Sequence, residues 1–340
     1  MIKKVILPVL VVVSLQSVYA AKMPTPNKEM DTVLTTLSAK GGKPIEQLDA
    51  KEARKQPTPT DAVKTVMSEK NITAPSNVTT KDIQIDGAQG KITARVYTPA
   101  GAIKPIPVVV YYHGGGFVIA DNDVYDATPR SLAEQTKAIF VSVEYRKAPE
   151  FKFPAAHDDA IAAYKWVLKN AASFDGDPKR VAVAGESAGG NLALNVAIAA
   201  RDGKYQLPTH ELLIYPVAGS YMGTASYKEN ANAKPLNKEM MSWFLNNYLA
   251  DPKQKDDKRI NLLTANLQGL PDATIITAQI DPLRSEGMEL AEKLKAAGVD
   301  VKYKNYNGVT HEFFGMAPVL KEAKQAQELA AKDLTKSFKQ

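Results

Sequence analysis

The chain has 340 residues and no cysteine. Disulfides, thiol nucleophiles and zinc sites built on thiolates are therefore excluded. Histidine is scarce as well, with four residues, so imidazole chemistry has few candidates. Charge of one sign is not concentrated, because 43 Lys and Arg are balanced by 37 Asp and Glu. The two signs alternate closely, as in residues 251–259, which is typical of a solvated surface, and nucleic-acid binding is not expected.

Long apolar runs are absent apart from one at the start of the chain. A basic beginning is followed by the apolar run Val5 to Val13 and then by Val18-Tyr19-Ala20. This order predicts a secretory signal peptide over residues 1–20 and hence an exported protein, periplasmic or secreted. An uncleaved anchor is the alternative, but the run is short for a membrane-spanning helix and contains Pro8. No stable membrane span is expected after cleavage.

Hydrophobic periodicity divides the rest of the chain into regions. Residues 27–70 have apolar positions at helical spacing, and residues 82–98 alternate as in an antiparallel hairpin. From Pro107 onward, nearly continuous apolar strands alternate with helices. This indicates an α/β fold with a mainly parallel sheet covered by helices on both faces. The expected strands are 108–112, 138–144, 180–184, 211–215, 273–280 and 300–306, and the expected helices are 130–135, 156–170, 187–200, 286–297 and 318–338.

The segment 220–263 interrupts this rhythm with a bulky apolar helix in a polar surround. Together with residues 21–75 it is expected to form a helical cap above the sheet. Residues 76–340 would then be the core, with a cap insertion at about 220–263. An ordinary packing helix is the alternative interpretation of the inserted segment. Four aromatic residues are candidate walls of a substrate pocket, although core packing would explain them equally well: Phe117, Trp243, Phe244 and Tyr248.

The motif Gly185-Glu-Ser-Ala-Gly189 lies between an apolar strand and an alanine-rich helical segment. Gly-x-Ser-x-Gly in a strand–turn–helix context is the nucleophile elbow, which raises a serine hydroxyl above a parallel sheet. The two glycines permit a turn that is too tight for side chains. Because the five-residue pattern is common, Ser187 needs a base, an acid and an oxyanion hole before it can be interpreted as a nucleophile.

Open parallel sheets bind ligands beyond the carboxyl ends of their strands, so catalytic side chains should follow strands. His311 follows the last expected strand and is the candidate general base. Asp281 directly follows strand 273–280 and is the candidate acid, although a helix N-cap would explain it equally well when taken alone. Glu286, inside the next helix, is a less direct candidate. The order Ser, Asp, His is that of α/β-hydrolases.

A glycine-rich loop, His113-Gly-Gly-Gly-Phe117, follows the strand 108–112. Its bare backbone N–H groups can supply an oxyanion hole together with the N–H of Ala188. A phosphate-binding loop is the alternative, but no Lys-Ser/Thr follows and the spacing is not Gly-x-Gly-x-x-Gly. The other histidines, His113, His157 and His210, are expected to be structural.

Six motifs occur in order along the chain: His113-Gly-Gly-Gly-Phe117, Glu144-Tyr-Arg-Lys-Ala-Pro-Glu150, Phe153-Pro-Ala-Ala-His-Asp-Asp159, Gly185-Glu-Ser-Ala-Gly-Gly190, Asp281-Pro-Leu-Arg284 and His311. Over about residues 80–315 the chain resembles the hormone-sensitive lipase group of bacterial esterases. The resemblance implies an α/β-hydrolase with a helical cap, a serine carboxylesterase for short-acyl esters that needs neither metal nor organic cofactor. Its partner would be a small-molecule ester. By position it implies Ser187 as nucleophile, Asp281 as acid, His311 as base, and Gly115, Gly116 and Ala188 as oxyanion donors.

The chain departs from this group at three positions. Glu186 stands where Asp is frequent, Lys147 replaces an apolar residue, and Glu312 follows His311 where Gly is more usual. The last change is expected to reshape the wall beside the base. Two rival functions share the fold. An amidase or deacetylase would have an identical elbow, whereas the presence of both His311 and Asp281 argues against a non-catalytic ligand receptor.

Overall fold

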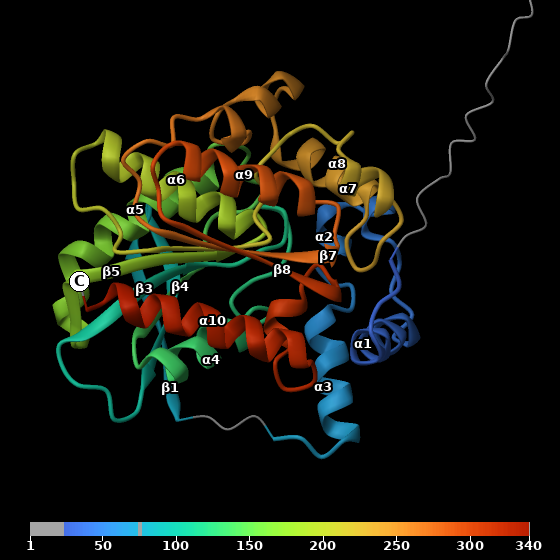
Figure 1. Ribbon diagram of the computed structural model, residues 1–340, viewed down its shortest axis with the longest axis horizontal. Helices are drawn as coiled ribbons and strands as arrows, with labels where there is room; N and C mark the ends of the chain where they lie inside the picture. Colours follow the sequence, from blue (N-terminus) through green and yellow to red (C-terminus); the bar gives the residue numbers. More distant parts are fainter. Residues whose placement is uncertain (1–23, 74–76, 340) are drawn as a thin grey trace, which may run out of the picture.

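An eight-stranded sheet forms the centre of the molecule (Figure 1), in the order β1-β2-β4-β3-β5-β6-β7-β8. The computed structural model describes residues 24–73 and 77–339, so the expected signal peptide lies outside the described residues. Strands β1, β2 and β4 pair antiparallel, and the other neighbours are parallel, which confirms the expected fold class. The strands are β1 Val78–Asp86, β2 Lys91–Pro99, β3 Ile106–Tyr112, β4 Ile139–Val143, β5 Gly176–Glu186, β6 Glu211–Ile214, β7 Ala273–Ile280 and β8 Val301–Thr310.

Helices cover both faces of the sheet. Figure 1 shows α5, α6 and α9 on one face and α4 and α10 on the other. The α-helices are α1 Lys28–Ala39, α2 Ala50–Ala53, α3 Pro59–Glu69, α4 Ala127–Thr136, α5 Ala155–Asn170, α6 Ala188–Asp202, α7 Ala225–Glu229, α8 Lys238–Tyr248, α9 Arg284–Ala296 and α10 Lys321–Ser337. Short 3-10 turns are η1 Ile45–Gln47, η2 Ala171–Phe174, η3 Pro252–Asp256, η4 Leu262–Thr264 and η5 Phe313–Met316.

The apolar composition of the central strands follows from burial on both faces. In β3, Val108 and Val110 belong to the apolar cluster on one face, and Val109 and Tyr111 belong to the cluster on the other. Successive side chains of a strand point to opposite faces, so a strand covered by helices on both sides must be apolar at every position. The edge strand β8 alternates instead between exposed and less exposed residues.

Strand β8 is longer than its sequence pattern predicts. The expected strand ended at residue 306, whereas β8 runs to Thr310. The turn-like residues Asn307 and Gly308 are accommodated because the β7–β8 register shifts between Ala278 and Ile280, and Gly308 adopts a positive φ of 72°. Pairing then resumes between Ile280 and Thr310. This irregular strand delivers the next residue, His311, to the carboxyl edge of the sheet.

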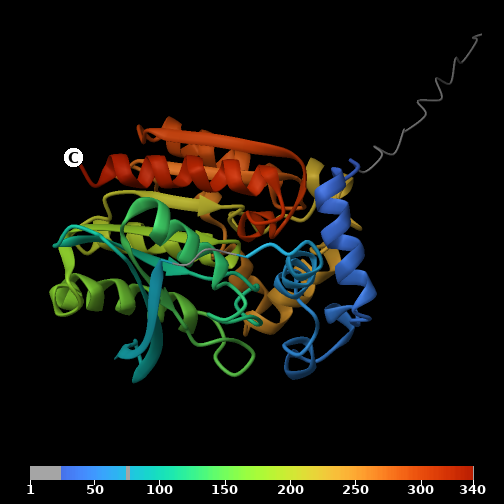
Figure 2. The ribbon, with the colours of Figure 1, turned by 90° about the horizontal axis from the view of Figure 1, so that it is seen from below.

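The N-terminal helices lie at one end of the sheet in both Figure 1 and Figure 2. Helix α3 begins at a capping box, in which Thr58 and Asp61 satisfy each other's backbone N–H groups and Pro59 occupies the first turn. The indole N–H of Trp243 in α8 donates to the carbonyl of Leu48 at 2.9 Å, which fastens α8 to the N-terminal segment. The boundaries of cap and core stay predictions. Within residues 24–73 and 77–339, none of the helices has the length and apolarity to cross a membrane.

A buried carboxylate of α5 links the β1–β2 hairpin to the loop that follows β4. Asp159 of α5 is inaccessible to solvent. It accepts hydrogen bonds from the Arg146 side chain at 2.7 and 3.0 Å and from the Arg146 backbone at 3.1 Å. Its Oδ1 also accepts from the backbone N–H of Ala88 in the hairpin turn, at 2.9 Å. Three separate segments therefore depend on one side chain.

We expect Asp159→Ala to lower the free energy of unfolding by about 3 kcal/mol, because the buried guanidinium edge and the Ala88 N–H lose their acceptor. Urea denaturation followed by circular dichroism measures the loss. Asp158→Ala is the matched control, since the Asp158 side chain makes no hydrogen bond among the described residues and burial raises its pKa. Equal stability losses in the two variants would contradict this role of Asp159.

Candidate active site

Ser187 lies at a sharp turn between β5 and α6. Its φ of 56° and ψ of −116° are unfavourable for a side-chain-bearing residue, and such strain is held only by tight surroundings. A Cβ atom on Gly185 would overlap the carbonyl of Gly189, and one on Gly189 would overlap the carbonyl of Tyr112. The two glycines of the motif are therefore required by close backbone approach, and the turn presents the Ser187 hydroxyl at the carboxyl edge of the sheet.

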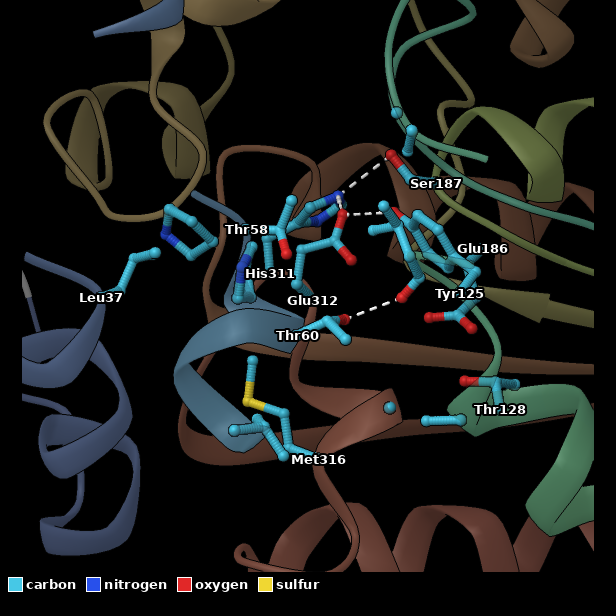
Figure 3. A pocket seen from close by; sticks show the side chains of 18 of the residues that line it. Leu37, Thr58, Thr60, Tyr125, Thr128, Glu186, Ser187, His311, Glu312 and Met316 are labelled. Atoms are coloured by element: carbon cyan, nitrogen blue, oxygen red, sulfur yellow. Dashed lines mark hydrogen bonds and ion pairs between the residues drawn. The ribbon is translucent and has the colours of Figure 1, made fainter. Parts of the chain in front are cut away.

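Asp281 and His311 reach Ser187 from the ends of β7 and β8, which lie beyond β6 in the sheet. The Nε2 atom of His311 lies 3.0 Å from Oγ of Ser187 (Figure 3). Its Nδ1 lies 2.6 Å from Oδ2 of Asp281. A carboxylate accepts, so Nδ1 carries the proton and the neutral ring can accept at Nε2. The other oxygen of Asp281 accepts from the Leu283 N–H at 2.8 Å. Asp281 thus makes a backbone turn contact and orients the imidazole at the same time.

The protonation of His311 is governed by opposing effects. Burial lowers the pKa of the imidazole, whereas the charge and the hydrogen bond of Asp281 raise it, with further upward contributions from Glu312 and Glu186. The net result is a pKa above its ordinary value. The second candidate acid, Glu286, makes no hydrogen bond to His311. It accepts instead from the backbone N–H groups of Ala218 and Gly219, and burial raises its pKa to about 8.

The glycine loop lies beside the serine. Gly115 and Gly116 have φ values of 95° and 59°, which favour glycine, and both residues line the cavity that reaches Ser187. Their N–H groups have no hydrogen-bond acceptor in the described part of the chain. Ala188 is the first residue of α6, where an N–H lacks an intrahelical acceptor. The hydroxyl of Tyr145 donates to the carbonyl of His113 at 2.9 Å and so holds the start of the loop.

A cavity of about 1370 Å³ opens over this edge of the sheet. Figure 3 shows Ser187, His311 and Glu312 at one part of its wall, and Thr60 and Met316 at another. Residues from α1 and α3 line it together with residues around α8.

Of the four aromatic residues predicted for the pocket wall, Phe244 lines the cavity. It packs where a Cβ atom of Gly116 would have to lie. Phe117 and Tyr248 are buried and stack on each other with ring centroids 4.2 Å apart, away from the cavity lining. Trp243 is also absent from the lining and is held by its bond to Leu48. These three residues pack outside the cavity lining, as the alternative of core packing expects, and their contact with a substrate stays a prediction.

The remaining histidines have other partners. His113 contacts the Gly114 carbonyl and stacks on Tyr145, with ring centroids 4.4 Å apart. His157 lies between the Tyr248 hydroxyl at 2.7 Å and the Asn191 side chain at 2.9 Å. His210 lies at the opposite strand edge, 2.9 Å from the Thr274 hydroxyl. Burial lowers the pKa of all three rings, as for uncharged packing groups.

The sequence pattern missed a carboxyl cluster beneath the triad. Glu186 is buried and accepts from the hydroxyls of Tyr111, at 2.6 Å, and Tyr215. Its pKa is raised to about 7, mainly by burial and also by the charge of Glu312. Glu312 in turn accepts from the Tyr125 hydroxyl at 2.6 Å. Glu186 and Glu312 each lie next to a catalytic candidate in the sequence, and this could have indicated the cluster. No sequence motif marks the tyrosines that bind them.

Across residues 24–73 and 77–339, no group of three His, Cys, Asp or Glu side chains is arranged to hold a metal ion.

Comparisons with known proteins agree with this geometry. A family model described as alpha/beta hydrolase fold matches residues 109–315. The carboxylesterase NlhH of Mycobacterium tuberculosis is 41% identical over 69% of this chain and 75% of its own. The ethyl acetate hydrolase of Pseudomonas putida is 31% identical over 82% of this chain and 88% of its own. A hyperthermophilic esterase from the archaeon Pyrobaculum calidifontis superimposes with a TM-score of 0.83 at 36% identity, covering 92% of this chain and 99% of that one.

These matches show that the chain is an ester hydrolase. It belongs to the α/β-hydrolase family, in the branch related to hormone-sensitive lipase that contains these carboxylesterases.

Proposed function

We propose that the protein is a serine carboxylesterase for short-acyl esters, with Ser187 as nucleophile, His311 as base and Asp281 as the orienting acid. The observation that carries the proposal is the continuous hydrogen-bond chain from Ser187 through His311 to Asp281, at 3.0 and 2.6 Å. The short-acyl preference is supported by the ethyl acetate hydrolase among the relatives and by Phe244, which packs directly over the glycine loop.

Acylation in this proposal begins when Oγ of Ser187 attacks the ester carbonyl and its proton passes to Nε2 of His311. Asp281 stabilises the resulting imidazolium. The N–H groups of Gly115, Gly116 and Ala188 stabilise the oxyanion of the tetrahedral intermediate, and one such donor typically contributes about 3 kcal/mol. Collapse of the intermediate breaks the bond to the alcohol oxygen, which takes the proton from Nε2 and leaves as the free alcohol.

Deacylation repeats these steps with water. Neutral His311 accepts a proton from the water as it attacks the acyl-serine, and a second oxyanion forms in the same place. The second intermediate expels Oγ of Ser187, which recovers the proton from Nε2. The products are one carboxylic acid and one alcohol for each ester and water consumed. The positive end of α6 at Ala188 favours negative charge at both stages.

We expect Ser187→Ala to reduce hydrolysis of p-nitrophenyl butyrate at least about a thousandfold, because no other hydroxyl occupies the elbow. Initial rates at 405 nm measure the loss, and an unchanged melting temperature shows that the fold is intact. The wild-type enzyme should turn over acetate and butyrate esters faster than the laurate. Substantial turnover by Ser187→Ala would exclude this mechanism.

The second prediction concerns pH and rests on the raised pKa of His311. The base must be neutral, so kcat/KM should rise with pH through a midpoint above the ordinary histidine value of about 6.5. The measurement is kcat/KM for p-nitrophenyl butyrate between about pH 5 and 9, with the histidine range inside the window. A midpoint below the ordinary value would mean that burial outweighs the Asp281 carboxylate.

We also propose that the protein is exported and that residues 1–20 are removed. The support is the basic start and the short apolar run in the sequence. Expression of the full chain in a Gram-negative host should give a periplasmic or secreted protein whose N-terminal sequence begins at Ala21. Leu10→Arg, which interrupts the apolar run, should retain the uncleaved chain in the cytoplasm. An unprocessed N-terminus on exported wild-type protein would contradict cleavage.

A further inference from the structure

Glu312 lies beside the nitrogen that moves the proton in the proposed reaction. Its Oε1 is 3.9 Å from Nε2 of His311 and accepts from the Tyr125 hydroxyl at 2.6 Å (Figure 3). Its Oε2 has no hydrogen-bond partner among the described residues, and the side chain is 22% exposed where it lines the cavity. One oxygen therefore fixes the carboxylate, and the other is available to a ligand.

The backbone at Glu312 adds a second observation. Its φ is 71°, in the left-handed region that favours glycine and disfavours a long side chain. Glycine would continue the chain from β8 into η5 at this φ with less strain. A glutamate next to the candidate base is therefore not explained by the turn alone. Strained residues of this kind concentrate at functional sites.

The position of Glu312 relative to Nε2 identifies which part of a substrate it meets. Nε2 has to deliver its proton to the leaving alcohol oxygen, so that oxygen must approach within hydrogen-bond distance, about 3 Å. The alcohol oxygen then lies within about 7 Å of Oε1 of Glu312. Substituents on the first carbons of the alcohol are thus the part of the ester that the carboxylate can contact.

The charges around Glu312 are predominantly negative. The groups that face it are the His311 imidazole and the Tyr125 hydroxyl, with the carboxyls of Glu186 and Asp281 further away. The basic residues that line the same cavity do not neutralise it. Four are paired with other carboxylates: Arg54 with Glu150, Arg95 with Asp82 and Asp123, Arg130 with Asp126, and Lys147 with Glu144. The other four are exposed to solvent: Lys43, Lys64, Lys234 and Lys324.

We propose that Glu312 is a specificity-determining residue that makes the leaving-group side of the site selective for esters of cationic alcohols, such as amino or quaternary-ammonium alcohols. The inference rests on the proposed esterase function and names a substrate class for it. A positive group two carbon atoms from the ester oxygen can approach Oε2, whereas an anionic group there is repelled by Glu312 and the carboxyls behind it.

The test compares two esters with the same acyl group and nearly the same shape, acetylcholine and its neutral isostere 3,3-dimethylbutyl acetate. The quantity measured is the ratio of their kcat/KM values. We expect this ratio to fall about tenfold from wild type to Glu312→Gln, because the interaction is electrostatic and partly open to water. Glu134→Gln is the control. Glu134 lines the cavity from α4 and accepts a hydrogen bond from Asn77, so its replacement should leave the ratio unchanged.

The pH dependence separates a charge effect from a change of shape. Burial raises the pKa of Glu312, more than His311 and Tyr125 lower it. The carboxylate therefore gains charge as pH rises, so the wild-type ratio should increase with pH above the ordinary glutamate value of about 4.3. In Glu312→Gln this increase should be much smaller, because the remaining carboxyl that gains charge, Glu186, is buried behind residue 312. Glu312→Gly, which suits the positive φ, keeps the question testable if the glutamine variant misfolds, and it should behave in the same direction.

One result would overturn this role: a ratio that is the same in wild type and Glu312→Gln, including the case in which both esters lose activity equally. Failure of the underlying function is distinguishable, because the wild-type enzyme would then hydrolyse neither these esters nor p-nitrophenyl butyrate. In that case calorimetric titration of acetylcholine into Ser187→Ala and into Ser187→Ala/Glu312→Gln decides the matter. Tighter binding that depends on Glu312 supports the cation site, and equal binding excludes it.

Discussion

The site depends on the close approach of two backbones, those of Gly189 and Tyr112. Because Gly189 has no side chain, the start of α6 can press against the end of β3, where any Cβ atom would overlap the Tyr112 carbonyl. This contact sets the spacing between the elbow and the glycine loop that follows β3. It places the Ser187 hydroxyl, the first N–H of α6 and the N–H groups of the loop around one small volume. Without it the serine and its oxyanion donors would be on separate elements with no common centre.

A second constraint is electrostatic. The base is surrounded by carboxyl groups, of which Asp281 is bonded to it and Glu312 and Glu186 are near enough to raise its pKa. Negative charge around an imidazole stabilises its protonated form, which assists proton uptake from the serine. The same charge opposes the oxyanion, so it must be kept from the oxyanion hole. The tyrosine hydroxyls do this in part, since they donate hydrogen bonds to Glu186 and Glu312 and so stabilise part of the carboxylate charge.

The order of strands and helices was predictable from the sequence, and so was the triad. Both follow from local rules. Continuous apolar strands identify a parallel sheet, and the requirement that functional residues follow strands selected His311 over His210. The same rule indicated Asp281, directly after its strand, and kept Glu286 in the next helix as a less direct candidate. The triad geometry was found at those positions. The aromatic residues show where such rules stop. Phe117, Tyr248 and Phe244 are similar in the sequence, but the first two stack on each other in the core and the third faces the cavity. That difference is set by tertiary packing, which no local pattern encodes.

The carboxyl cluster was unpredictable for a related reason. Glu186 and Glu312 lie 126 positions apart and interact because their neighbours Ser187 and His311 must be 3.0 Å apart. The catalytic contact thus brings these two carboxyl groups near enough to interact electrostatically, and Tyr125, from a loop without a motif, donates a hydrogen bond to Glu312. In the role proposed for Glu312, the residue directly after the base acts on the alcohol part of the substrate without any change in the triad. One reaction geometry can then be combined with different alcohol specificities.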